Sequence, residues 1–218
     1  MDIYQQMSEE FNATFTSHSK TLSKIAPEYI KLLPCAPTEA LLLLDSMVKT
    51  GEWLGFNFMA LAIKSRNNMY LLDFMDTYER WLYEYALTWG RCDIFCYRVL
   101  NPMFTRFTPE LMPLCLKWAV SEKTYVRRAS AVCMIESTQS FIVNTDFSNV
   151  EIIAELLKHD KEDHVRKGLG WLLKYAYLTY PSETLEYLKQ NIDLLSRTTY
   201  RYALEKMDSE LRKDMLQL

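Results

Sequence analysis

The stretches VRRA at residues 126–129 and VRKG at residues 165–168 decide the predicted fold, because they repeat one pattern in two successive segments of the chain. Each copy follows a short polar turn and begins an apolar helix. A period of about 40 residues with two helices per repeat is typical of HEAT-type solenoids, in which stacked helix pairs bury each other's apolar faces. The sequence therefore predicts an all-α, right-handed solenoid of HEAT-like helix pairs, with an irregular helical bundle as the alternative.

The rest of the chain has the same helical character. From about residue 38 onward, apolar residues recur at intervals of three and four positions, and no stretch alternates strictly enough to predict a sheet. Only 5 of the 218 residues are glycine, so few turns with positive φ are expected. The length favours one elongated domain, residues 1–218. Polar or proline-containing joints predict breaks between helices at 34–37, 50–51, 67–68, 101–102, 108–109, 121–124, 146–149 and 180–181.

Composition excludes several classes of protein. Hydrophobic residues make up 49% of the chain and charged residues 24%, which excludes a disordered or collagen-like chain. The net charge of −3 argues against nucleic-acid binding driven by overall charge. Residues 1–60 hold four Lys, no Arg and seven Asp or Glu, whereas residues 61–218 hold 21 Lys or Arg and 21 Asp or Glu. Any nucleic-acid site must therefore be a local basic groove.

The chain start and the cysteines predict a cytoplasmic protein. The first ten residues, MDIYQQMSEE, have neither the basic nor the apolar segment of a signal peptide, and the longest apolar runs, such as residues 41–44, are too short for a membrane span. The five cysteines are odd in number and form no CxxC pair, which favours reduced and mostly buried thiols over disulfides. We expect a monomer that has no membrane partner.

Two charged motifs are candidate functional sites. Trp89 and Asp93 are four residues apart, so on a helix the indole and the carboxylate lie one turn apart on the same face. The alternative is an exposed Asp near a helix N-terminus, where the helix dipole favours it. Arg127 and Arg128 point about 100° apart on a helix, so one can face a groove while the other meets solvent or an acidic neighbour. Ordinary surface charges are the alternative for this pair.

Trp171 follows a stretch of small residues, Gly168-Leu169-Gly170, in the middle of a predicted helix. Each glycine costs roughly 1 kcal/mol there, so a neighbouring helix or a nucleic-acid backbone should approach closely. His159, Asp160, Asp163 and His164 have the composition of a metal site but not the helical spacing of a zinc site, and we predict no metal or cofactor. The motifs of acyl transfer, nucleotide hydrolysis and hydride transfer do not occur.

Taken in order, WGRCD at 89–93, YVRRASAV at 125–132, VRKGLGWLLKY at 165–175 and RTTYRYALEKM at 197–207 resemble the DNA alkylation repair family, the AlkD-like HEAT-like repeat alkylpurine DNA glycosylases. The resemblance covers residues 53–208. It implies an all-α, C-shaped solenoid that holds duplex DNA in a concave groove and removes N3- or N7-alkylated purines as a hydrolase. No cofactor is implied.

The resemblance also implies roles for individual residues. Asp93 would be catalytic and would stabilise positive charge that develops on the deoxyribose. Trp89 and Trp171 would flank the backbone of the lesion, and Arg128 would contact DNA beside it. Arg127, Arg166 and Lys167 are the predicted phosphate contacts. A cationic purine is already a good leaving group, so a preorganised anion and aromatic faces near an oxocarbenium-like transition state are sufficient in principle.

Residues 1–52 depart from the family pattern. Pro27 and Pro34 should limit a long helix, no Gly-Ile-x-x-Pro-x-Arg segment follows, and the acidity of this region is unfavourable for phosphate contacts. Two functions therefore compete: an active glycosylase, or a HEAT-like protein that binds DNA weakly with reduced or absent base excision. The sequence alone favours the second. If residues 20–52 fold as a basic-faced helix at the mouth of the groove, they favour the enzyme; if they are short, absent from the groove or acidic, they count against it.

Overall fold

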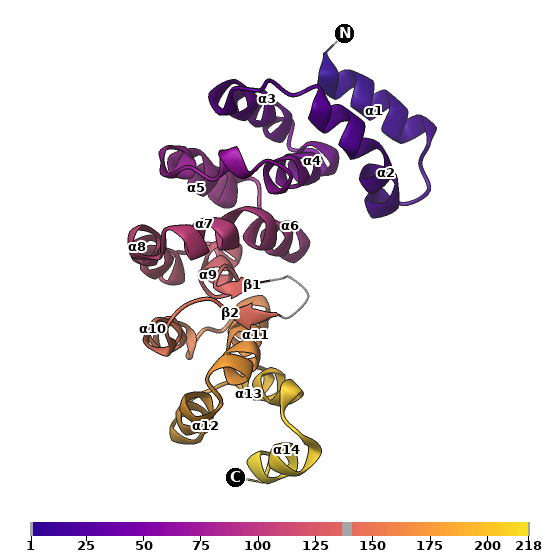
Figure 1. Ribbon diagram of the computed structural model, residues 1–218. Helices are drawn as coiled ribbons and strands as arrows, with labels where there is room; N and C mark the ends of the chain where they lie inside the picture. Colours follow the sequence, from indigo (N-terminus) through magenta and orange to yellow (C-terminus); the bar gives the residue numbers. More distant parts are fainter. Residues whose placement is uncertain (1, 137–140, 218) are drawn as a thin grey trace. The chain divides into compact units, whose positions relative to one another are not determined.

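The computed structural model describes residues 2–136 and 141–217, and the regular secondary structure of these residues is almost entirely helical (Figure 1). Short 3-10 helices (η1, η2 and η4) and one π-helix (η3) lie between or within the α-helices. The elements are α1 (Ile3–Ala13), α2 (His18–Lys31), α3 (Pro37–Lys49), α4 (Trp53–Lys64), η1 (Asn67–Met69), η2 (Leu72–Phe74), α5 (Met75–Glu84), α6 (Trp89–Phe95), η3 (Cys96–Leu100), α7 (Asn101–Arg106), α8 (Thr108–Ala119), α9 (Thr124–Val132), β1 (Ile135–Glu136), β2 (Ile142–Val143), α10 (Phe147–Leu157), α11 (Asp163–Thr179), α12 (Pro181–Gln190), α13 (Arg197–Ala203), η4 (Leu204–Lys206) and α14 (Ser209–Met215).

Contacts divide the chain into two compact units, Met1–Tyr85 and Ala86–Leu218. The boundary therefore lies well beyond residue 52, where the divergent N-terminal region ends. That the whole chain is a single domain stays a prediction. Among the described residues, no helix is both long enough and apolar enough to cross a membrane. All five cysteines are free, and all except Cys35 are buried.

The first unit contains α1 to α5. Helix α2 packs on α1 and α4, and α3 packs on α4. Pro27 was expected to limit a long helix in the N-terminal region. Helix α2, which has 14 residues in all, nevertheless continues past Pro27 and ends at Lys31. The reason is that Pro27 is on the exposed side of the helix, so the carbonyl that loses its N–H partner there can bond to water.

The second unit has two layers of helices. Helices α8, α10 and α12 form one layer; helices α6, α9, α11 and α13 form the other, which lies on the opposite side of the unit in Figure 1. Within the second layer, α9 packs on α6 and α11, and α11 packs on α13. The VRRA and VRKG stretches fall in α9 and α11, the second helices of two successive pairs. The predicted all-α helical repeat fold is therefore confirmed.

One predicted break is wrong, because the helix that begins at Trp89 continues to Arg106. At Asn101 the backbone N–H bonds to the carbonyl of Cys96, five residues back, so the helix widens into the π-turn η3 immediately before Pro102. This widening accommodates a proline that has no N–H for a regular helical bond. The Asn101 side chain donates to the Cys133 carbonyl at 2.9 Å, which satisfies a backbone group at the end of α9.

The expectation of no sheet is also wrong in one place. Strands β1 and β2 pair antiparallel, with Ile135 opposite Val143 and Glu136 opposite Ile142. Two-residue strands are too short for an alternating pattern to be recognised in the sequence. The pair interrupts the repeat between α9 and α10, and β2 packs on α11.

Candidate functional site

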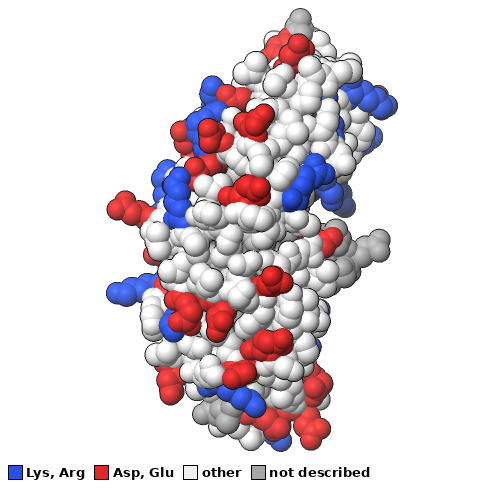
Figure 2. Space-filling model, turned by 60° about the vertical axis from the view of Figure 1, so that its left-hand side comes forward, with Lys and Arg blue, Asp and Glu red and all other residues white. Residues whose placement is uncertain are grey.

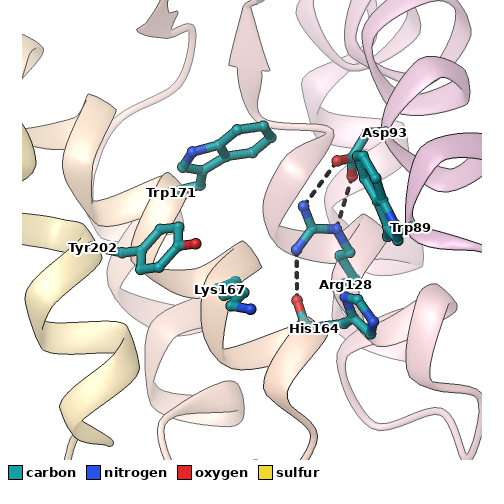
Figure 3. A pocket seen from close by; sticks show the side chains of 7 residues that line it. All are labelled: Trp89, Asp93, Arg128, His164, Lys167, Trp171 and Tyr202. Atoms are coloured by element: carbon teal, nitrogen blue, oxygen red, sulfur yellow. Dashed lines mark hydrogen bonds and ion pairs between the residues drawn. The ribbon is translucent and has the colours of Figure 1, made fainter.

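A pocket of about 270 Å³ lies in the second unit, between the second helices of successive pairs (Figure 3). It brings together side chains that are far apart in the sequence, from α6 to α13. Its lining residues are Trp89, Asp93, Arg128, His164, Lys167, Trp171 and Tyr202. Five of the seven predicted site residues thus meet at one pocket; the other two, Arg127 and Arg166, do not line it.

Helix α6 positions the first two of these residues. The hydroxyl of Thr88 accepts a hydrogen bond from the Arg91 N–H at 3.3 Å and so caps the helix start. Trp89 and Asp93 then follow one turn apart, and Tyr97 comes one further turn along. The Trp89 side chain is 58% exposed, whereas Asp93 is only 5% exposed. The alternative of an exposed Asp at the helix N-terminus is therefore wrong.

Arg128 of α9 joins three successive helices. Its Nε and Nη2 donate to Oδ1 and Oδ2 of Asp93 at 2.7 and 2.9 Å, and its Nη1 donates to the His164 carbonyl at 2.5 Å (Figure 3). This two-point geometry is the strong form of an Arg–carboxylate bond. Burial acts to lower the pKa of the Arg128 guanidinium, but the hydrogen bonds to Asp93 and the charge of Asp93 act in the opposite direction, and the pKa is raised overall.

Trp171 of α11 lies on the other side of this ion pair from Trp89 (Figure 3). Its ring centroid is 5.5 Å from the Arg128 Cζ and 5.4 Å from the Lys174 Nζ. Cation–π contacts with these two side chains hold the indole in place. The pocket therefore has an exposed indole on one side, a cation-bound indole on the other, and a buried carboxylate between them.

The two glycines before Trp171 have separate neighbours. A Cβ on Gly170 would lie 2.8 Å from the Thr199 carbonyl oxygen, so the backbone of α13 makes the close approach there. A Cβ on Gly168 would lie 3.1 Å from the Arg128 Cγ. Of the two alternatives for this stretch, the neighbouring helix is correct for Gly170, and Gly168 leaves room for the Arg128 side chain to reach Asp93.

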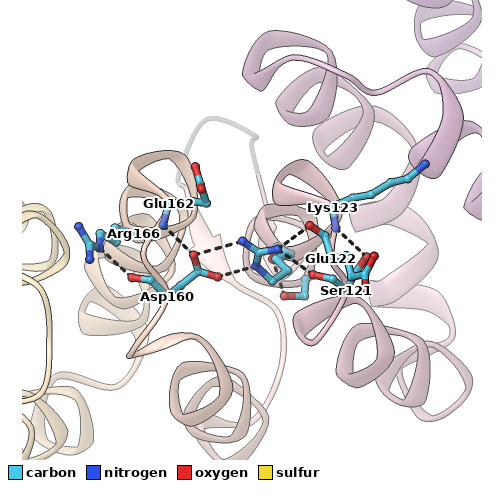
Figure 4. A network of polar contacts seen from close by, with 8 residues as sticks. Ser121, Glu122, Lys123, Asp160, Glu162 and Arg166 are labelled. Atoms are coloured by element: carbon cyan, nitrogen blue, oxygen red, sulfur yellow. Dashed lines mark hydrogen bonds and ion pairs between the residues drawn. The ribbon is translucent and has the colours of Figure 1, made fainter.

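Arg127 and Arg166 belong to a polar network at the joints between helices (Figure 4). Arg127 donates to both carboxylate oxygens of Asp160, at 2.5 and 3.3 Å, and to the carbonyls of Ser121 and Glu122 at 2.7 and 3.0 Å. Arg166 donates through Nε to the Asp160 carbonyl at 2.7 Å. The network fastens the α8–α9 turn to the α10–α11 turn. That either arginine contacts a phosphate stays a prediction.

Sequence reasoning did not place three residues of this region at the site, and it considered one of them, His164, only as a metal ligand. His164 and Tyr202 line the pocket, and Tyr97 has its ring centroid 6.1 Å from that of Trp171. Burial, together with the charge of Asp93, raises the pKa of the Tyr97 hydroxyl, which has no hydrogen-bond partner among the residues that the structure describes. The signal for Tyr97 was available, since it continues the four-residue spacing of Trp89 and Asp93. The signal for Tyr202 was its place in the RTTYRYALEKM stretch.

The two layers of the second unit differ in charge. Helices α9, α11 and α13 contain seven Arg or Lys and one Asp, whereas α8, α10 and α12 contain two Lys and five Glu. Acidic side chains outnumber basic ones on the face of this unit that Figure 2 presents. The pocket therefore lies in the basic layer, which a polyanion would prefer.

Among the described residues, no group of three or more His, Cys, Asp and Glu side chains could hold a metal ion. The segment of His159, Asp160, Asp163 and His164 instead contributes ion pairs. Asp160 pairs with Arg127 as described above, and Asp163 pairs with Lys167 at 2.6 Å.

Comparisons with known proteins show the family and the fold of this chain. The family model described as "DNA alkylation repair enzyme" matches residues 4–207, which include most of the N-terminal region that departs from the family pattern. A solved structure described as a predicted DNA alkylation repair enzyme from Enterococcus faecalis has the same fold, with a TM-score of 0.70 and 14% sequence identity over 95% of this chain and 96% of that one. A comparison with curated proteins finds no match. Because the family model spans nearly the whole sequence, this chain belongs to the DNA alkylation repair enzyme family.

Proposed function

We propose that this protein binds duplex DNA through the basic layer of its second unit and removes cationic N3- or N7-alkylated purines at the pocket of Trp89, Asp93 and Trp171. The observation that carries the proposal is the convergence of these side chains, together with Arg128, on one pocket. A cytoplasmic location and a monomeric state belong to the same proposal.

The chemistry needs little from the protein. When the bond between C1′ and the cationic base breaks, the base leaves as a neutral molecule and positive charge develops on the deoxyribose. The Asp93 carboxylate would stabilise that charge, and the indoles of Trp89 and Trp171 would face the sugar and its phosphates. A water molecule then adds to C1′, and its proton is released. The open pocket would permit this without a deep cavity for a flipped base.

The first unit supplies further support. Helix α2 carries Lys20, Lys24 and Lys31 at spacings of four and seven residues, so all three exposed lysines lie on one face. A basic-faced helix within residues 20–52 was expected to favour the enzyme if it lay at the mouth of a groove; that α2 lies there stays a prediction. Its lysines could neutralise phosphates, although the surrounding segment 1–60 has a net charge of −3.

One observation favours the second candidate function, a protein that binds DNA without excision. The Asp93 carboxylate is neutralised by a buried guanidinium, since both of its oxygens accept hydrogen bonds from Arg128. If Arg128 stays on Asp93 when DNA is bound, the carboxylate has less charge with which to stabilise a cationic sugar.

Release of free base tests the proposal. The protein is incubated with duplexes that contain 7-methylguanine or 3-methyladenine, and the released base is measured against spontaneous depurination without protein. Release above that background supports the enzyme. If base release does not exceed spontaneous depurination but the protein binds the same duplexes in a salt-dependent way, the protein binds DNA without catalysis.

A further inference from the structure

A second pocket, of about 430 Å³, adjoins the first and is formed mainly by the C-terminal helices. Lys167 and Tyr202 line both pockets. The other basic residues of the second pocket are Arg197 and Arg201 of α13 and Arg212 of α14. We call it the arginine pocket.

The charges of the arginine pocket are not balanced within the protein. Its two acidic residues each have a lysine partner: Asp163 bonds Lys167 at 2.6 Å, and Glu205 bonds Lys174 at 2.9 Å. The guanidinium groups of Arg197, Arg201 and Arg212 form no ion pair with any residue that the structure describes. Three guanidinium groups around one hollow therefore leave a positive charge that is not paired within the part of the chain that the structure describes.

Planar guanidinium groups match the oxygens of a phosphate, because each can donate two parallel hydrogen bonds. The hydroxyls of Thr198 and Tyr202, which also line the pocket, can add further donors. An anionic tetrahedral group therefore fits this donor set better than a carboxylate, which offers only two acceptor atoms.

We propose that the arginine pocket binds a phosphate group of the DNA strand whose damaged nucleotide occupies the neighbouring pocket. The choice of DNA as ligand rests on the proposed function. Because Lys167 and Tyr202 border both pockets, one strand can pass from the first pocket to the second without leaving the basic layer. The group is either an internal phosphodiester or the terminal phosphate of a broken strand.

The test compares Arg201→Ala and Arg212→Ala with the control Lys213→Ala, which removes the same charge from α14 outside the pocket. Affinity for a duplex is measured between 50 and 200 mM salt. For each phosphate contact, log affinity falls by about 0.9 per unit of log salt concentration. The ratio of the affinity at 50 mM salt to that at 200 mM salt should therefore be about 3.5-fold smaller for each contact that a variant loses. The control should retain the wild-type ratio.

Two further measurements separate the outcomes. Nicked duplexes with and without a 5′-phosphate distinguish the sources: weakening of all duplexes assigns an internal phosphodiester, and weakening of the phosphorylated nick alone assigns a terminal phosphate. Titration with inorganic phosphate, followed by the NMR signals of the arginine Nε–H groups, should shift those of Arg197, Arg201 and Arg212.

If the wild type binds DNA but the arginine variants keep its salt dependence on intact and on 5′-phosphorylated nicked duplexes alike, the arginine pocket does not bind a phosphate of the strand, and the proposed function is unaffected. If inorganic phosphate shifts the arginine signals but no duplex binds, both the proposed function and the assignment to a DNA strand are overturned.

Discussion

Arg127 and Arg128 are neighbours on one helix, yet their ion pairs belong to different regions of the molecule. Arg127 donates to Asp160 in the turn between α10 and α11, and its Nη1 donates to two backbone carbonyls in the turn between α8 and α9. Arg128 bonds Asp93 in the preceding pair of helices, at the border of an open pocket. Both pairs hold successive repeats together, but only the second leaves its carboxylate beside a space that a ligand can enter. The Arg127–Asp160 pair therefore stabilises the stacking of repeats, whereas the Arg128–Asp93 pair also forms part of a pocket.

Asp93→Asn tests the site side of this comparison. The amide keeps the size of the carboxylate but loses its charge, so excision should fall by about 10²-fold or more. The free energy of unfolding should also fall, by about 3–5 kcal/mol, because Arg128 is left buried without its counterion. Base release at a temperature where the variant is folded, together with urea unfolding, measures both effects. Retained release of 7-methylguanine from the folded variant would refute the catalytic role of Asp93.

Arg128→Ala removes the other partner of the same pair. It leaves the Asp93 carboxylate buried and unpaired, so a loss of stability of about 3–5 kcal/mol is expected here as well. Binding of DNA should weaken at both 50 and 200 mM salt. Unchanged affinity at the two salt concentrations would contradict the assignment of this residue to a DNA-binding surface.

Arg127→Ala should also lower stability, but with a smaller effect on function. It removes hydrogen bonds to a charged group at the joint, and we expect a loss of about 2–3 kcal/mol in the free energy of unfolding, or about 5–10 °C in Tm. DNA affinity per folded molecule should fall less than in Arg128→Ala, because the Arg127 donors are engaged within the joint. A double-mutant cycle with Asp160→Asn measures the coupling, and weaker DNA binding in a fully folded variant would show that Arg127 also contacts phosphate.

Trp89→Ala should affect function without affecting stability. The side chain is 58% exposed, so its removal should change the free energy of unfolding by less than about 0.5 kcal/mol. Loss of an aromatic face should weaken binding of a lesion duplex about 10-fold. Leu87→Ala is the matched control, because Leu87 is equally exposed, two residues away, and outside the pocket. Equal effects of the two substitutions would remove Trp89 from the site.

Sequence patterns were sufficient for the repeat and for five of the seven residues that line the pocket. The copies at 126–129 and 165–168 identified the second helices of two pairs, and Trp89, Asp93, Arg128 and Trp171 followed from the family motifs. The partner of each residue could not be predicted, because the Arg128–Asp93 bond depends on how neighbouring repeats stack. The same limit applies to Arg127, which looks identical to Arg128 in sequence but faces the joint.

The N-terminal region shows a different limit. Helix α2 continues through Pro27 because the proline lies on the exposed side, and exposure is a tertiary property that local propensity does not include. The π-turn at η3 was missed for a related reason. Asn101-Pro102 is a reasonable helix break by its residue types, but the buried bond from Asn101 to Cys133 belongs to the packing of α9.

The π-turn also fixes the rotation of one half of its helix relative to the other. A helix turns by about 100° per residue, so one additional residue in a turn rotates everything after it by that angle. The Trp89 and Asp93 side chains precede the turn and point to the pocket, while Met103 and Phe104 follow it and are fully buried. Deletion of a single residue within 97–100 would restore regular winding, and the two halves could then not both keep their present orientations.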